Sequence, residues 1–206
     1  MIEETWIERY VPTTGIGFID VGANLCSWTK WLAPGYGFVH AVEPFQKAID
    51  AAGALPENVT MHPFGAWSME GNIHFGIYGP TKLLFAQEGI SSYFADIGTN
   101  PPIGPESLVL PCKTLDSMVP EKDEIDFLKV DVEGAELQVL LGARDIIARS
   151  RPFTIIEIHS KKNGMKIEEI LHKDGYEMEI VRSPFYDEHQ HHPHWSNHYW
   201  LICAPD

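Results

Sequence analysis

The sequence predicts a single α/β domain with a mostly parallel sheet and helices on both of its faces. In two stretches, short apolar runs alternate with segments of helical spacing. Residues 17–64 have the order strand, helix, strand, helix, strand, and residues 125–173 resume this alternation. Such an order is typical of parallel strands joined by right-handed crossovers. With no linker in the chain, we expect one domain over 1–206, with a core at about 16–205 and a short extension at 1–15.

The first half of the chain supplies three strands and two helices. Pro34 and Gly35 end the first helix, and Pro44 opens the second, because proline fits the first turn of a helix. The strands are expected at 17–21, 37–42 and 59–64, and the helices at 25–33 and 44–55.

The middle of the chain departs from this alternation. Residues 72–78 alternate like a strand, and we expect them to form a hairpin with the end of the third strand. Residues 79–106 are rich in glycine and proline, which predicts a long loop inserted for substrate binding. A further strand is expected at 107–112, followed by a short helix from Thr114.

The second half repeats the pattern and ends in a pair of strands. Apolar residues recur at helical spacing over 134–149, which predicts one helix there. Gly175 follows the last helix as its C-cap. The strands are expected at 125–132, 153–158, 176–181 and 199–203, the helices at 134–149 and 166–173, and a polar loop at 182–197.

Composition and charge limit the classes of function. The chain has 15 Lys and Arg against 29 Asp and Glu, a formal charge of −14. We expect no nucleic-acid partner and no anionic membrane surface, since both need a basic face. No apolar run is long enough to span a membrane. Three scattered cysteines and the acidic start of the chain, which is no signal peptide, indicate a cytoplasmic protein with reduced thiols.

A candidate nucleotide pocket follows the first two strands. Asp20, Gly22 and Asn24 lie where the first strand meets its helix, and Glu43 ends the second strand. Ligands of such sheets bind at the carboxyl ends of strands, and an acid at about this spacing commonly hydrogen-bonds a ribose diol. The loop lacks the G-x-G-x-x-G turn that a pyrophosphate needs. The carboxylate at this turn favours S-adenosylmethionine, which carries an ammonium group and no phosphate, over NAD.

Three segments together resemble the FkbM family of class I methyltransferases. They read FIDVGANLCSWTKWLAPGYGFVHAVEP, IDFLKVDVEGAELQVLLGA and TIIEIH, and they lie in this order between Phe18 and His159. The resemblance implies a Rossmann-like class I methyltransferase fold with a C-terminal antiparallel strand. It also implies S-adenosylmethionine as cofactor and O-methylation of a hydroxyl on a small molecule or sugar.

The resemblance assigns a set of residues to the cofactor. Phe45 is expected to pack on the adenine. Cys26 departs from the family, which usually has glycine there; its side chain either narrows the approach to the methionine end of the cofactor or points into the seam between sheet and helix. The cofactor-binding candidates are Asp20, Gly22, Asn24, Glu43, Pro44, Phe45, Gly65, Ala66 and Asp131.

The segment LKVDVEGAE carries the first part of a candidate catalytic site. If the strand extends that far, Lys129, Asp131 and Glu133 lie on one of its faces. Buried carboxylates are costly unless paired, which favours a function for Asp131 and Glu133, with Lys129 as a structural partner. Glu136 is expected only to complement the dipole of the following helix.

The next strand ends in a second pair, Glu157 and His159, two residues apart on one face. Because the two strands are expected to be neighbours, Asp131, Glu133, Glu157 and His159 are predicted to converge as the catalytic residues. Methyl transfer needs an aligned acceptor oxygen and, for a hydroxyl, a base. His159 or Asp131 is the candidate base; the alternative for His159 is a hydrogen-bonded core histidine. Asp131, Glu157 and His159 also suit a divalent cation, although we expect no metal.

Two loops carry candidate substrate contacts. The family's variable region corresponds to the central loop, which holds Ser91, Ser92 and Tyr93. The run His189–His198 holds five of the ten histidines and Trp195, which is expected to shield the substrate. We expect this run to be a solvent-exposed loop, with a weak metal site or a pH-sensitive lid as alternatives.

Two other classes of function stay open at the level of the sequence. One is a nicotinamide-dependent oxidoreductase, which the missing glycine-rich turn disfavours. The other is a non-catalytic member of the fold that binds a nucleoside, since a fold alone does not imply activity. For the enzyme, the expected acceptor is a small molecule or carbohydrate. The sequence does not indicate an oligomeric state.

Overall fold

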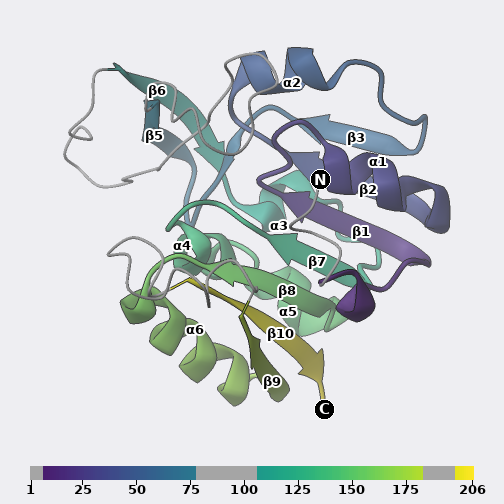
Figure 1. The fold of residues 1–206 in the computed structure, drawn as a ribbon, viewed down its shortest axis with the longest axis vertical. Helices are drawn as coiled ribbons and strands as arrows, with labels where there is room; N and C mark the ends of the chain where they lie inside the picture. The colour runs from purple at the N-terminus through teal and green to yellow at the C-terminus, as the bar shows by residue number, and fades with distance from the viewer. Residues whose placement is uncertain (1–6, 78–105, 183–197) are drawn as a thin grey trace.

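The computed structural model describes residues 7–77, 106–182 and 198–206, which form a seven-stranded sheet, a smaller three-stranded sheet and the helices packed on them (Figure 1). The large sheet has the strand order β3-β2-β1-β7-β8-β10-β9. Its strands are β1 Gly15–Val21, β2 Tyr36–Val42, β3 Val59–His62, β7 Phe127–Val130, β8 Phe153–Ile158, β9 Tyr176–Val181 and β10 Tyr199–Pro205.

Five neighbouring strands, from β3 to β8, run parallel, whereas β10 pairs antiparallel with both β8 and β9. This confirms the predicted parallel sheet with an antiparallel C-terminal strand. The helices are α1 Ser27–Leu32, α2 Gln46–Ala52, α3 Leu115–Met118, α4 Glu136–Leu141, α5 Arg144–Ser150 and α6 Lys161–Lys173, with 3-10 turns at Glu8–Tyr10 and Ala33–Gly35. None of the helices in the described ranges is long and apolar enough to cross a membrane.

Successive residues of the central strands enter two apolar clusters, one on each face of the sheet. Ile19 and Val21 of β1 pack with the core residues of α3, α4, α5 and α6. Phe18 of the same strand packs on the opposite face with α1, Ile7 and Val11. Helices therefore cover both faces, and part of the segment before β1 contributes to the core.

The strand at 72–78 pairs differently from the prediction. β5 (Gly71–Ile77) is antiparallel to β6 (Glu106–Lys113) and makes no ladder with β3. The two residues of β4 (Gly65–Ala66) complete this small sheet as a parallel partner of β6. The expected hairpin was wrong because β6, 28 residues beyond β5 in the chain, supplies the partner edge.

Three predicted helices also differ. α6 begins at Lys161, five residues before its expected start. The helix expected over 134–149 is two, α4 and α5, because Gly142 interrupts it: a Cβ atom at Gly142 would lie 2.0 Å from the carbonyl oxygen of Trp67. α2 begins at Gln46 and not at Pro44, since the Phe45 amide donates to the Glu43 carboxylate and holds an extended backbone. In the second half, β7 ends at Val130, two residues before the predicted end.

Candidate functional site

The carboxyl ends of β1, β2, β7 and β8 lie beside one another, because the strand order makes these four strands neighbours. The candidate cofactor and catalytic residues follow these ends. The loops after β1 and β2 form the first half of the site, and the residues after β7 and β8 form the second half.

The loop after β1 turns sharply at Gly22. Its φ of +75° is a left-handed conformation, and a Cβ atom there would lie 1.8 Å from the carbonyl oxygen of Asp131. The amides of Gly22 and Ala23 both donate to the Val42 carbonyl at 3.0 Å, which ties the loop to the end of β2. Only glycine allows the loops after β1 and β7 to approach this closely.

Glu43 joins the loops after β1 and β2. It is buried, and its carboxylate accepts from the amides of Asn24 and Phe45, both at 2.9 Å. Burial raises the pKa of Glu43, although these two hydrogen bonds oppose the shift. Each carboxylate oxygen retains acceptor capacity, as a ribose diol would require.

Cys26 points into the seam between sheet and helix, the second of the two orientations left open by the sequence. Its side chain is fully buried and packs with Ala23, Ala41 and Ala52. Burial raises the pKa of its thiol to about 11. The backbone is left-handed, with φ of +59°, which explains why a related sequence would have glycine at this position.

Asp20 is fully buried and bonded to protein groups. Its Oδ2 accepts from the amide and the hydroxyl of Thr29, at 3.1 and 2.6 Å, which caps the first turn of α1. Lys129 lies 3.2 Å from its Oδ1 and 3.6 Å from Asp131 Oδ2, and donates to the Gly22 carbonyl. Burial lowers the pKa of Lys129, but Asp20 and Asp131 outweigh it and raise the pKa. Lys129 therefore pairs with both carboxylates and offsets one of their two charges.

His159 lies at the centre of the second half of the site, immediately after β8. Its Nδ1 is 2.7 Å from Glu136 Oε1, and its Nε2 is 3.3 Å from Glu133 Oε2. The same Nε2 lies 3.9 Å from Glu157 Oε2 and 4.0 Å from Asp131 Oδ1. The structure thus brings Asp131, Glu133, Glu157 and His159 together, although Glu133 reaches the cluster from a left-handed turn and not from the strand.

Burial and neighbouring charges shift the pKa values of His159, Asp131 and Glu133. Burial alone would lower the pKa of His159, but Glu133, Glu157 and Glu136 raise it well above its usual value. Burial opposes the ionisation of Asp131 as well, yet Lys129 and His159 hold its pKa below the usual range. Burial raises the pKa of Glu133. Asp131 and Glu133 are partly exposed, at 31% and 37% of their side chains, whereas His159 is 5% exposed.

Sequence reasoning missed two members of the cluster. Glu136 was expected only to complement the helix dipole, but it is fully buried, holds His159 Nδ1 and accepts from the Gly134 amide at 2.6 Å. Its helical neighbours Val139 and Leu140 are core residues, and that spacing would have placed Glu136 on the inner face.

His198 is the second missed residue. It was expected in an exposed loop, but it is 5% exposed and its ring lies 4.8 Å from the His159 ring, edge to face. The pairing of Tyr199 with Ile158 places His198, just before β10, next to His159, just after β8. For His198 the exposed-loop prediction was wrong.

Some of the other predicted site residues are described by the structure, and the rest lie outside the described ranges. Gly65 and Ala66 are buried in β4, and a Cβ atom at Gly65 would meet Ile73, so its neighbours explain this glycine. Phe45 is buried against Ala48 and Leu110. Their roles toward a cofactor stay predictions, as do those of Pro44, Gly22, Asn24, Glu43 and Asp20. The substrate candidates Ser91, Ser92, Tyr93 and Trp195, and residues 189–197 of the histidine-rich run, lie outside the described residues.

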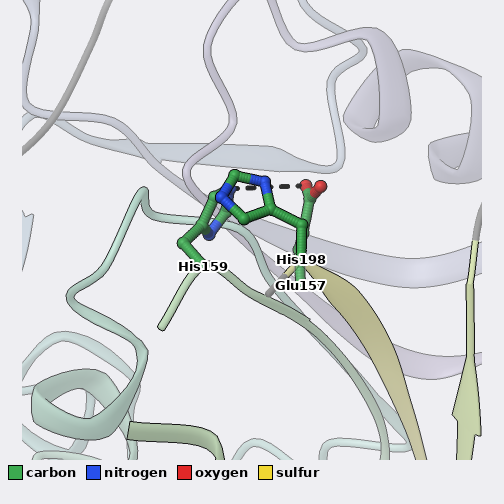
Figure 2. Close-up of side chains that lie close together, drawn as sticks. All are labelled: Glu157, His159 and His198. Atoms are coloured by element: carbon green, nitrogen blue, oxygen red, sulfur yellow. Dashed lines mark ion pairs between the residues drawn. The ribbon is translucent and has the colours of Figure 1, made fainter. Parts of the chain in front are cut away.

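Two groups of side chains in the described ranges have the composition of a metal site. They are Glu157, His159 and His198, drawn in Figure 2, and Asp131, Glu133 and His159. In each group, one potential ligand atom per residue lies within 4.8 Å of the others. The set expected from the sequence, Asp131, Glu157 and His159, takes members from both groups.

Comparison with protein families matches residues 20–178 to the model of the methyltransferase FkbM domain. The match begins at Asp20 and includes both halves of the site except His198. One curated protein, the AMB antimetabolite synthetase AmbE of Pseudomonas aeruginosa, is 32% identical over 76 residues, 33% of this chain. The chain spans 4% of the length of that relative.

Solved structures of similar fold include the methyltransferase FkbM of Methylobacillus flagellatus KT, with a TM-score of 0.59 and 15% identity. That match covers 92% of this chain and 44% of the solved chain. A putative S-adenosylmethionine-dependent methyltransferase from Listeria monocytogenes has a TM-score of 0.56 and 7% identity, over 99% of this chain and 96% of its own. At these identities the likeness establishes the fold.

Proposed function

The chain belongs to the methyltransferase FkbM family, and on this premise we propose that it transfers the methyl group of S-adenosylmethionine to a hydroxyl of a small molecule or sugar. The observation that carries this proposal is the cluster of Asp131, Glu133, Glu157 and His159 beside the loop of Gly22. The family and the fold imply the cofactor, whereas the hydroxyl acceptor is a proposal that rests on the family resemblance.

The chemistry of the donor set fits this cofactor. The described residues at the strand ends offer carboxylates, which suit an ammonium and a sulfonium group, and the turn at Gly22 has a lysine buried beneath it and no glycine-rich phosphate cradle. We assign Gly22 and Asn24 to the methionine side. Glu43 would accept from the ribose hydroxyls, and Phe45 would pack on the adenine.

The reaction is an in-line displacement. When bound, S-adenosylmethionine supplies the methyl group: the acceptor oxygen forms a bond to the methyl carbon as the carbon–sulfur bond breaks, and S-adenosylhomocysteine leaves. The hydroxyl proton passes to the cluster, where Asp131 is the candidate acceptor, because the raised pKa of His159 keeps its imidazole protonated. Asp131 is partly exposed and is reachable by an acceptor. Glu136 acts as a positioning residue, because it fixes the ring of His159 through Nδ1.

The net charge of the chain indicates which chemical class of methyl acceptor to expect. A net charge of −14 disfavours nucleic acid, so we propose a neutral or cationic small molecule or a carbohydrate. All three cysteines are buried thiols, which agrees with a cytoplasmic enzyme, and this location is part of the proposal.

A labelled methyl donor tests the proposed function. Incubating the protein with S-adenosylmethionine that carries a trideuteromethyl group, and with panels of sugars, alcohols, phenols and matched amines, is expected to place the label on an oxygen. S-adenosylhomocysteine should form in equal amount, as mass spectrometry of both products would show. Label found only on nitrogen would contradict O-methylation. Cofactor binding without S-adenosylhomocysteine formation across the panel would favour a non-catalytic member of the fold.

A further inference from the structure

Two histidines and one glutamate, Glu157, His159 and His198, lie together in the site (Figure 2). Glu157 belongs to β8, His159 follows its last residue, and His198 precedes the first residue of β10. Glu157 and His198 are buried, with 8% and 5% of their surface exposed, and the side chain of His159 is 5% exposed. The antiparallel pairing of β8 and β10 fixes their relative positions, since Tyr199 is opposite Ile158 and Trp200 is opposite Glu157.

The hydrogen bonding of His159 leaves one defined nitrogen for a ligand. Its Nδ1 donates to Glu136 Oε1 at 2.7 Å, so Nε2 faces the cluster. Glu136 is fully buried and is itself held by the Gly134 amide, which fixes the ring of His159 and leaves Nε2 as the nitrogen that a metal would bind by displacing its proton. A histidine that binds a metal almost always donates its other ring nitrogen to such an oxygen.

Carboxylates surround Nε2 and favour a positive charge there, which without a bound ion is the proton on the His159 ring. Carboxylate oxygens of Glu133, Glu157 and Asp131 lie 3.3, 3.9 and 4.0 Å from this one nitrogen. Among the described residues near the cluster, Lys129 is the lysine that offsets part of this charge, and it is engaged with Asp20 and Asp131. Buried carboxylates are stabilised when they are paired or when they coordinate a metal.

We propose that Glu157, His159 and His198 bind a divalent first-row transition-metal ion, with Asp131 and Glu133 at its open side. Two imidazoles and a carboxylate suit zinc, manganese or iron, whereas magnesium prefers oxygen ligands alone. Ligand atoms bound about 2.0–2.2 Å from one ion lie at most about 4.4 Å apart. The atoms here lie within 4.8 Å of one another, so small side-chain rotations close the site.

The ion would act on the acceptor hydroxyl, and this part of the inference rests on the proposed function. As a Lewis acid it lowers the pKa of a bound hydroxyl. The oxygen would then bond to the methyl carbon as the carbon–sulfur bond breaks and S-adenosylhomocysteine leaves, while its proton passes to Asp131. Metal binding itself does not depend on this role and can be measured without cofactor or acceptor.

Cobalt(II) is the probe for this site, because its absorption in the visible range reports coordination by nitrogen and oxygen. The histidine-rich run would also bind metal, so the experiment uses a background in which His189, His191, His192 and His194 are replaced by glutamine. In this background the full chain, treated with chelator and then titrated with cobalt, is expected to bind one equivalent. His198→Ala and Glu157→Gln are each expected to weaken that binding at least 10-fold, and His172→Gln, at an exposed histidine, is expected to leave it unchanged.

Two results would overturn the metal site. One is the loss of all stoichiometric cobalt binding when the four loop histidines are replaced. The other is unchanged binding in both His198→Ala and Glu157→Gln, each shown to be folded by circular dichroism. Glu157→Gln preserves side-chain volume and so separates lost coordination from lost folding. Titration of S-adenosylhomocysteine into the same proteins keeps a failed metal site distinct from a failed cofactor site.

Discussion

Replacing His159 with glutamine is expected to lower kcat by about 100-fold or more, while the Kd of S-adenosylmethionine changes by no more than about 3-fold. His159 pairs with Glu133, Glu136, Glu157 and Asp131, and only 5% of its side chain is exposed. Its loss removes the group that orients these carboxylates. Asp131→Asn is expected to lower kcat to a similar extent, because it removes one of the two partly exposed carboxylates of the cluster, the one that pairs with Lys129. Steady-state kinetics and calorimetry together measure the two effects.

The matched control for this pair is His172→Gln, a substitution of the same kind at an exposed position of α6. It should leave both kcat and cofactor affinity unchanged. Thermal unfolding of each variant separates lost catalysis from lost folding. Near wild-type turnover in both His159→Gln and Asp131→Asn would contradict the assignment of the cluster to the chemical step.

Gly22→Ala is expected to have the largest effect on stability. Its Cβ atom would lie 1.8 Å from the Asp131 carbonyl oxygen, and the residue would also have to keep a φ of +75°. A left-handed residue with a side chain costs about 1–2 kcal/mol, and a clash in a packed region costs about 1–3 kcal/mol more. We therefore expect the free energy of unfolding to fall by about 2–5 kcal/mol, together with loss of cofactor binding.

Gly53→Ala is the control that separates the cost of the steric clash at Gly22 from the cost of a positive φ angle. Gly53 has a similar φ of +69°, but a Cβ atom there meets nothing within 4 Å. Its substitution should cost only the backbone conformation, about 1–3 kcal/mol, because φ of +69° with ψ of −150° is a region that glycine almost alone adopts. Denaturant unfolding of both variants gives the comparison. Equal losses of stability would show that the loops after β1 and β7 do not approach as closely as described.

Local sequence patterns were enough to predict the strands of the large sheet and to place most of the site residues at strand ends. The alternation of apolar runs and helical spacing predicted the strands of the parallel sheet, and the alternation within strands placed Asp131, Glu157 and His159 at neighbouring strand ends. These features depend on contacts near in sequence or on the general rule that parallel strands share a carboxyl edge.

The features that were missed depend on contacts distant in sequence. β5 pairs with β6, and no pattern within residues 72–78 could indicate which edge is available. The break between α4 and α5 is due to the approach of the Trp67 carbonyl to Gly142, a contact across 75 residues. His198 joins the site through the register of β10 against β8, and without that register a histidine-rich polar run favours exposure.

The most direct test of the account is calorimetric titration of S-adenosylmethionine, S-adenosylhomocysteine and NAD into the purified protein. We expect both sulfur compounds to bind with micromolar Kd values and NAD to give no heat. Glu43→Gln should weaken their binding by about 10–100-fold, the usual worth of hydrogen bonds to a charged group, whereas the exposed Glu57→Gln should not. Absence of binding by both sulfur compounds, or binding of NAD in their place, would contradict the account.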